Sequence, residues 1–138
     1  MFWLKVSIIA ARVLIETVFF AIGASIFSFL NVVIYRLPRH MGYIEGKSMC
    51  TSCKHTLYSK DLIPIISWIS LKGRCRYCGE KISVRYTVVE VIGGISAVLA
   101  TLIIGINLWA LLAFVLTGVI TVSVCILYDR YTAQNKGE

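Results

Sequence analysis

Charged residues are scarce in this sequence. Only 15% of its 138 residues are Asp, Glu, Lys or Arg, whereas a soluble domain contains about one-quarter. Hydrophobic residues make up 58% of the chain, and the mean hydropathy is +0.81. The shortage of charge excludes a large water-soluble catalytic domain. The length is enough for a few membrane-spanning helices and one small extramembrane part.

Acidic residues are scarcer still, with 7 Asp and Glu against 14 Lys and Arg. Ten of the basic residues lie between Arg36 and Arg85, where only Glu45, Asp61 and Glu80 oppose them, so this segment carries the whole net charge of +7. Such a segment could bind nucleic acid. Because two long apolar stretches flank it, we interpret it as a loop that is retained in the cytoplasm.

Three apolar stretches predict three transmembrane helices, at about residues 6–35, 88–106 and 108–127. The first is far longer than the apolar core of about 7–15 residues in a cleaved signal peptide, so we expect an uncleaved helix. Gly105, Ile106 and Asn107 predict a tight turn between the other two.

The predicted fold is therefore an all-α polytopic membrane protein. Its expected parts are a first transmembrane helix (1–37), a cytoplasmic loop domain (38–87) and a transmembrane hairpin with a short tail (88–138). The charge distribution places the N-terminus outside and both the loop and the C-terminus in the cytoplasm.

Small and polar residues suggest how the helices pack. Two stripes of small residues predict a close helix contact, and they comprise Ala21, Ser25 and Ser28 in the first helix and Ala97, Thr101 and Gly105 in the second. Arg12 and Glu16 lie one turn apart on the first helix. Because charges are costly in lipid, we expect them to pair with each other or with a neighbouring helix.

Four cysteines carry the strongest chemical signal. Cys50 and Cys53 form one CxxC pair, and Cys75 and Cys78 form a second pair after 21 intervening residues. This spacing is typical of a tetrahedral, structural Zn²⁺ site that folds a zinc-ribbon-like loop. The alternatives are two disulfides or a redox pair, although disulfides are rare in the cytoplasm. Cys125, inside the third apolar stretch, is expected to be a small apolar filler.

Several motifs in the chain resemble the N-terminal domain of the bacterial type IV prepilin peptidase and N-methyltransferase family. These segments follow the order and approximate spacing of that family, and they are Ser28-Phe29-Leu30-Asn31-Val32-Val33-Ile34-Tyr35-Arg36-Leu37-Pro38, Asp61-Leu62-Ile63-Pro64-Ile65-Ile66-Ser67-Trp68, Gly73-Arg74-Cys75-Arg76-Tyr77-Cys78-Gly79, Ile82-Ser83 and Arg85-Tyr86-Thr87-Val88-Val89-Glu90. The resemblance covers about residues 23–94.

The resemblance implies an inner-membrane enzyme that cleaves the leader of prepilins and pseudopilins and methylates the new N-terminus with S-adenosylmethionine. It implies a substrate or methyl-donor region at Asn31, Arg36, Arg85 and Glu90. Because the chain contains no Gly-rich strand-to-helix loop, the methyl donor is suggested by resemblance alone.

The chain departs from the family pattern at the peptidase residues. Cleavage in the family uses two aspartates, the second in a Gly-x-Gly-Asp motif, and such a catalytic pair must lie close together. This sequence has no such motif, and its only aspartates are Asp61 and Asp129. Asp129 lies near the expected first catalytic position, although Tyr128 could occupy it. Smaller departures are Phe27, where the family commonly has Gly, and Thr87, where it commonly has Pro.

The sequence thus predicts a prepilin-peptidase-like N-terminal domain, as a separate protein or a truncated piece, whose peptidase half comes from another chain. Its expected partners are the lipid bilayer, prepilin N-terminal segments and that peptidase half. One alternative is a non-enzymatic membrane adaptor whose zinc ribbon binds a pilus or secretion component. The other is a membrane-tethered nucleic-acid-binding ribbon, for which stacking aromatics are few.

Overall fold

The computed structural model describes residues 1–40, 42 and 47–135 and is almost entirely helical. The elements, in chain order, are α1 (Phe2–Arg36), η1 (Leu37–Arg39), η2 (Ser59–Asp61), α2 (Ile66–Ser70), α3 (Val84–Ile104) and α4 (Leu108–Gln134). Helices α1, α3 and α4 are long and apolar enough to cross a membrane. The described residues contain no strands, only two isolated bridges. The predicted all-α fold with three spanning helices is confirmed.

Each spanning helix extends beyond its predicted apolar stretch, and α1 does so at its start, at Phe2. Helix α3 begins at Val84, before the predicted start at residue 88, because the Ser83 side chain caps it by accepting a hydrogen bond from the Arg85 backbone N–H. Helix α4 continues past the apolar stretch, from Leu127 to Gln134. Residues 136–138 of the predicted tail and Glu45 of the loop lie outside the described residues.

Helices α1 and α3 make the main contact of the fold. The Gly23 backbone approaches α3 so closely that an added Cβ atom would lie 2.3 Å from the Gly93 carbonyl oxygen and 2.8 Å from the Ala97 Cβ. The predicted stripe on α3 is therefore right at Ala97. On α1 the prediction is right at Ser28, whose hydroxyl donates to Glu90 of α3. It is wrong at Ala21 and Ser25, which are exposed. The α1 helix is apolar on every side, so its composition did not reveal which side packs.

Helix α4 completes a small core with these two helices. Phe27 is fully buried, and its ring lies 5.6 Å from the ring of Phe114. An added Cβ atom at Gly118 would contact Phe27 and Leu30. The large Phe27 side chain is therefore accommodated between α1 and α4 by small residues opposite it.

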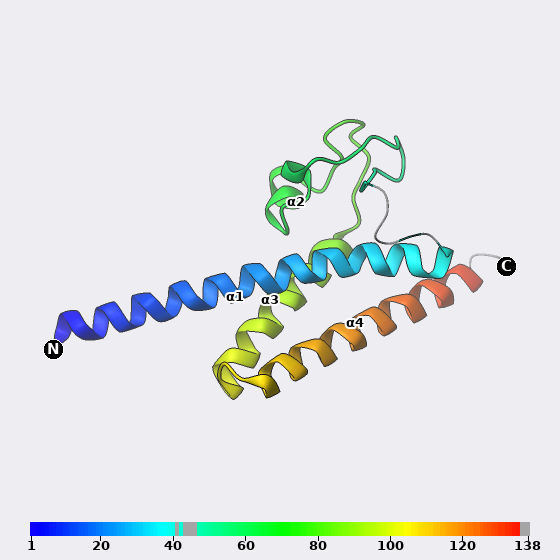
Figure 1. Cartoon of the computed structure of the whole chain (residues 1–138). Coiled ribbons are helices and arrows are strands. Elements are labelled where there is room, and N and C mark those ends of the chain that lie inside the picture. Colours follow the sequence, from blue (N-terminus) through cyan, green and yellow to red (C-terminus); the bar gives the residue numbers. More distant parts are fainter. Residues whose placement is uncertain (41, 43–46, 136–138) are drawn as a thin grey trace.

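Helices α1 and α4 run in the same direction, and α3 runs back between their ends in the opposite direction (Figure 1). The C-terminal ends of α1 and α4 lie at one end of the molecule, and the loop with α2 lies on the other side of α1 from α4. Near the opposite end, Thr101 Oγ1 donates to Glu16 Oε2 at 2.8 Å, so Glu16 pairs with a neighbouring helix, as expected. No ion pair joins Arg12 to Glu16 in the described part of the chain.

Candidate functional site

The two CxxC turns have the same backbone conformation. In the first, the Lys54 N–H donates to the Cys50 carbonyl at 3.0 Å; in the second, the Gly79 N–H donates to the Cys75 carbonyl at 2.9 Å. Lys54 and Gly79 both have positive φ angles, of 59° and 73°. Each turn closes with a second bond, from Cys50 N–H to the His55 carbonyl and from Cys75 N–H to the Glu80 carbonyl. These paired turns present four sulfur atoms toward one point.

The four Sγ atoms form a compact cluster that can hold a metal ion. All lie within 4.8 Å of one another, and Cys50 Sγ and Cys78 Sγ are 3.8 Å apart. A tetrahedral ion with metal–sulfur bonds of ~2.3 Å requires sulfur atoms about 3.8 Å apart. The donor set and its spacing therefore fit a four-coordinate metal, and the described residues contain no disulfide.

The thiols differ in acidity. Burial raises the pKa of Cys50, but hydrogen bonds from nearby backbone groups and thiols outweigh it and lower the pKa to about 7. At Cys78 a backbone hydrogen bond acts to lower the pKa, whereas burial and hydrogen bonds with the other three cysteines raise it to about 12. Metal binding must displace the thiol protons.

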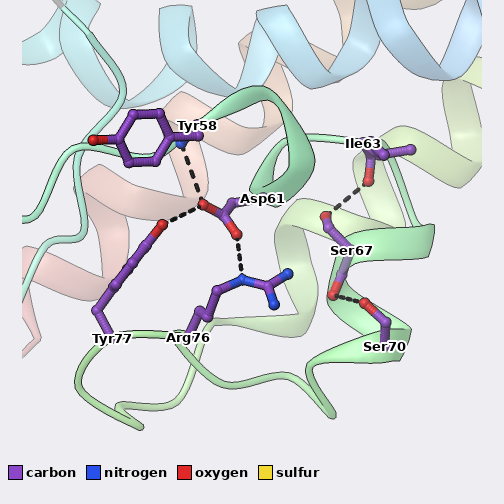
Figure 2. Close-up of polar contacts among 7 residues, drawn as sticks. All are labelled: Tyr58, Asp61, Ile63, Ser67, Ser70, Arg76 and Tyr77. Atoms are coloured by element: carbon purple, nitrogen blue, oxygen red, sulfur yellow. Dashed lines mark hydrogen bonds and ion pairs between the residues drawn. The ribbon is translucent and has the colours of Figure 1, made fainter.

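Asp61 fastens the loop around the second CxxC turn (Figure 2). Its side chain is only 3% exposed and accepts from Arg76 Nε at 2.7 Å, from the Tyr77 hydroxyl at 2.9 Å and from the Tyr58 backbone N–H at 3.2 Å. Burial raises the pKa of Asp61, but these donors, Arg76 first, outweigh it and lower the pKa below its usual value. The ring of His55, from the first turn, stacks on Tyr77 with centroids 3.7 Å apart. These contacts give Asp61 a structural role.

Glu90 joins the loop to the transmembrane helices. It is 9% exposed, its Oε1 accepts from the Ser28 hydroxyl of α1, and its Oε2 accepts from the Ile65 backbone N–H, both at 2.7 Å. Ile65 has a positive φ angle of 64°, which is rare for a β-branched residue. Three segments far apart in the sequence therefore meet at one carboxylate. All three residues lie in the motifs of the resemblance, but only Glu90 was predicted as a site residue, and no local signal indicated that Ser28 and Ile65 would bond to it.

A cavity of about 450 Å³ lies between the loop and helices α1 and α3. Three of the four residues predicted for the substrate or methyl-donor region, Asn31, Arg36 and Glu90, line it together. Arg36 also donates to the carbonyls of Gly42 and Lys47, at 2.9 and 3.3 Å. The volume is in the range of small-molecule sites, about 300–1,000 Å³.

Two polar atoms at this cavity have no hydrogen-bond partner among the residues that the structure describes. Asn31 Nδ2 donates to the Tyr86 carbonyl at 3.0 Å, but Asn31 Oδ1 and Thr87 Oγ1 are buried and unpaired. Both residues line the cavity. Thr87 is one of the two positions that depart from the resembled pattern, and its hydroxyl is left unsatisfied there.

Arg85 and Asp129 lie elsewhere. Arg85 Nη1 donates to Asp129 Oδ1, and this ion pair joins the start of α3 to the end of α4. Neither residue lines the cavity. The structure thus brings Asn31, Arg36 and Glu90 together at the cavity. Arg85 and Asp129 form a second polar contact away from it.

The sequence of this chain matches a known family and several known proteins. Residues 21–104 match the family described as the bacterial peptidase A24 N-terminal domain. The prepilin leader peptidase/N-methyltransferase of Myxococcus xanthus is 45% identical over 76 residues, which are 55% of this chain and 23% of that protein. The type 4 prepilin-like proteins leader peptide-processing enzyme of Escherichia coli O78:H11 is 38% identical over 114 residues, covering 70% of this chain and 42% of that protein.

A third relative covers more of the chain. The prepilin leader peptidase/N-methyltransferase of Pectobacterium carotovorum is 36% identical over 138 residues, covering 80% of this chain and 50% of that protein. The chain thus spans half or less of the length of these relatives. No solved structure matches it. Because the matched residues include α3, the C-terminal part of α1 from residue 21 and the whole four-cysteine loop, this chain belongs to the bacterial peptidase A24 N-terminal domain family.

Proposed function

We propose that this chain takes part in the processing and N-methylation of type IV prepilins or pseudopilins. The observation that supports this most is the cavity between the four-cysteine loop and helices α1 and α3, which Asn31, Arg36 and Glu90 line together. It lies where a substrate helix packed against the bundle would reach the loop. The relatives named as prepilin leader peptidase/N-methyltransferase support the same reaction.

The proposed cofactor of the loop is a structural Zn²⁺ ion on Cys50, Cys53, Cys75 and Cys78. Thiolates are soft ligands that suit zinc, and a set of four leaves no open coordination position for a reacting water. The ion would therefore fold the loop and shape one wall of the cavity. S-adenosylmethionine is proposed as the methyl donor, and it would supply the methyl group. Its carboxylate would be attracted to the basic surface of the loop.

We propose that this chain is not a peptidase by itself. Asp61 is bonded to Arg76 and Tyr77, and Asp129 is paired with Arg85. These contacts support structural roles for both aspartates and give neither the partner carboxylate that an aspartic peptidase needs. We propose that a peptidase half supplies the catalytic pair and that Asp129 contributes at most one carboxylate to it.

The proposed location is the bacterial inner membrane, with the N-terminus outside and both the loop and the C-terminus in the cytoplasm. Support comes from the basic residues of the loop, since loops rich in Lys and Arg remain cytoplasmic. The C-terminal ends of α1 and α4 lie at the same end of the molecule (Figure 1), as this topology requires.

A methyl-transfer assay tests the proposal. The purified chain, with and without a peptidase-half partner, is incubated with a pre-cleaved prepilin peptide and labelled S-adenosylmethionine. We expect label on the peptide N-terminus and its loss in Cys50→Ser and Cys75→Ser. Cys125→Ser removes a thiol outside the cluster and should keep the activity. No transfer in either condition, with one zinc bound per chain, would favour the non-enzymatic adaptor instead.

A further inference from the structure

The loop contains one segment without charge. Residues 62–71, between Asp61 and Lys72, include no Asp, Glu, Lys or Arg, although the surrounding loop is strongly basic. The segment includes helix α2 and reads Leu-Ile-Pro-Ile-Ile-Ser-Trp-Ile-Ser-Leu. A loop that is surrounded by water on all sides would not be expected to contain ten consecutive uncharged and mostly apolar residues.

The depth of this segment relative to the membrane surface follows from its hydrogen bond to Glu90. The Ile65 N–H donates to Glu90 Oε2 at 2.7 Å, and Glu90 lies six residues, or about 9 Å, into α3. Helix α3 has 21 residues, barely enough to cross a hydrocarbon core of about 30 Å. Its second turn must therefore lie below the membrane surface, and Ile65 with it. In Figure 1, α2 is level with the middle of α1, well short of the C-terminal end of α1.

The outer side of this segment is apolar. Ile63, Ile66 and Ile69 are spaced by three residues, and they are 45%, 64% and 62% exposed. Isoleucine side chains gathered in this way are unfavourable in water but favourable in hydrocarbon. They add to the exposed apolar side chains of the neighbouring spans, which include Val84 and Val88.

The polar side chains of the segment are satisfied without water. The Ser67 hydroxyl donates to the Ile63 carbonyl at 2.7 Å and the Ser70 hydroxyl to the Ser67 carbonyl at 3.0 Å, as Figure 2 shows. Trp68 Nε1 donates to the Ile82 carbonyl at 3.2 Å. In an apolar environment polar groups must be hydrogen-bonded within the protein, as these side chains are.

We propose that residues 62–71 form an interfacial segment that inserts into the bilayer leaflet in which α3 begins, with Ile63, Ile66 and Ile69 in contact with lipid acyl chains. Lys60 and Lys72 flank the segment, both exposed, and would reach the acidic headgroups. The four-cysteine loop is thereby anchored in the membrane surface, and the cavity opens at the level of the lipid headgroups.

Photolabelling from the lipid tests this proposal. The chain is placed in phosphatidylcholine–phosphatidylglycerol nanodiscs that contain a phosphatidylcholine with a diazirine on its acyl chain, then irradiated, digested and analysed by mass spectrometry. We expect adducts on residues 62–71 comparable with those on α4, and none on residues 47–60. Labelled spanning helices without label on residues 62–71 would overturn the proposal.

Paired variants identify the cause of the labelling. Ile66→Asp combined with Ile69→Asp should lose the adducts of the segment, whereas Ile66→Leu combined with Ile69→Leu should retain them. Zinc content, measured on both, reports whether the four-cysteine cluster still folds. If the aspartate variant keeps its zinc and its adducts, contact by the isoleucines is refuted. A photoreactive benzoylphenylalanine at position 66 that captures protein rather than lipid in cells would also overturn the proposal.

Discussion

Individual polar residues in this chain have roles that depend on how completely they are paired. Asp61 has three donors and holds the loop together. Glu90 has two neutral donors and no cationic partner among the described residues. Thr87 Oγ1 has no hydrogen-bond partner in the described part of the chain. A buried side-chain oxygen thus stabilises the fold where it is hydrogen-bonded, as at Asp61, and destabilises it where it has no partner, as at Thr87.

Asp61→Asn should destabilise the loop in a pH-dependent way. The pKa of Asp61 is lowered in the folded state, so its contribution is present above the unfolded pKa of about 3.9 and is lost as the pH falls through the lower folded pKa. We expect a loss of about 1 kcal/mol at pH 7, because Arg76 is partly exposed, and little difference near pH 2. Denaturant unfolding followed by tryptophan fluorescence measures it, in a background where Trp3 and Trp109 are replaced by Phe so that Trp68 alone reports. Lys60→Gln, at an exposed neighbour, should show no such pH dependence.

Thr87→Val should leave the fold intact and raise its stability by about 1 kcal/mol. The substitution keeps the shape of the side chain and removes a buried hydroxyl that has no partner. The midpoint of thermal unfolding in detergent, compared with the wild type, measures the effect. Thr117→Val is the control, since its hydroxyl donates to the Ala113 carbonyl at 2.9 Å and its loss should bring no gain. A destabilised Thr87→Val would mean that the hydroxyl has a partner.

The helices were predictable as elements, but their packing was not. The lengths of the apolar stretches predicted the positions of α1, α3 and α4. The turn between α3 and α4 lies at Gly105, Ile106 and Asn107, as their residue types indicated. The buried side of α1 includes Gly23 and Phe27 instead of the predicted Ala21 and Ser25. Lipid-facing and protein-facing positions are equally apolar here, so periodicity could not distinguish them.

Gly23→Val should separate α1 from α3. A Cβ atom at Gly23 would lie 2.3 Å from the rigid Gly93 carbonyl oxygen, so the helices must move apart, at a cost of about 1–3 kcal/mol. Resistance to unfolding in a denaturing detergent, measured by the loss of helical circular dichroism, should fall accordingly. Ala21→Val, on the exposed side of α1, is the matched control. Equal stability of the two variants would contradict the close contact.

The whole molecule combines two parts with different sources of stability. The three helices are held by lipid and by helix packing, whereas the loop has little core of its own and depends on the four-cysteine cluster, the Asp61 contacts and the bond from Ile65 to Glu90. Stability should therefore be lost in two steps, because metal removal affects only one part.

Chelation of the metal should unfold the loop and spare the helices. After treatment with a strong chelator we expect residues 47–83 to become sensitive to protease, while helical circular dichroism falls only slightly. Lower pH should act in the same direction, since protons compete with metal for the thiolates. Limited proteolysis with mass spectrometry, with and without added zinc, measures this. The Cys125→Ser variant should behave as the wild type, and full loss of helicity on chelation would contradict the two-part description.

The sequence by itself determined the three apolar helices, the four cysteines that can hold a metal ion and the family, because each depends on composition or on spacing over a few residues. Only the tertiary structure decided that Glu90 joins Ser28 to Ile65, that Arg85 pairs with Asp129, and that Asn31, Arg36 and Glu90 share one cavity. These contacts link positions up to 62 residues apart. They depend on the angle and register of packed helices, which an apolar sequence in lipid leaves unspecified.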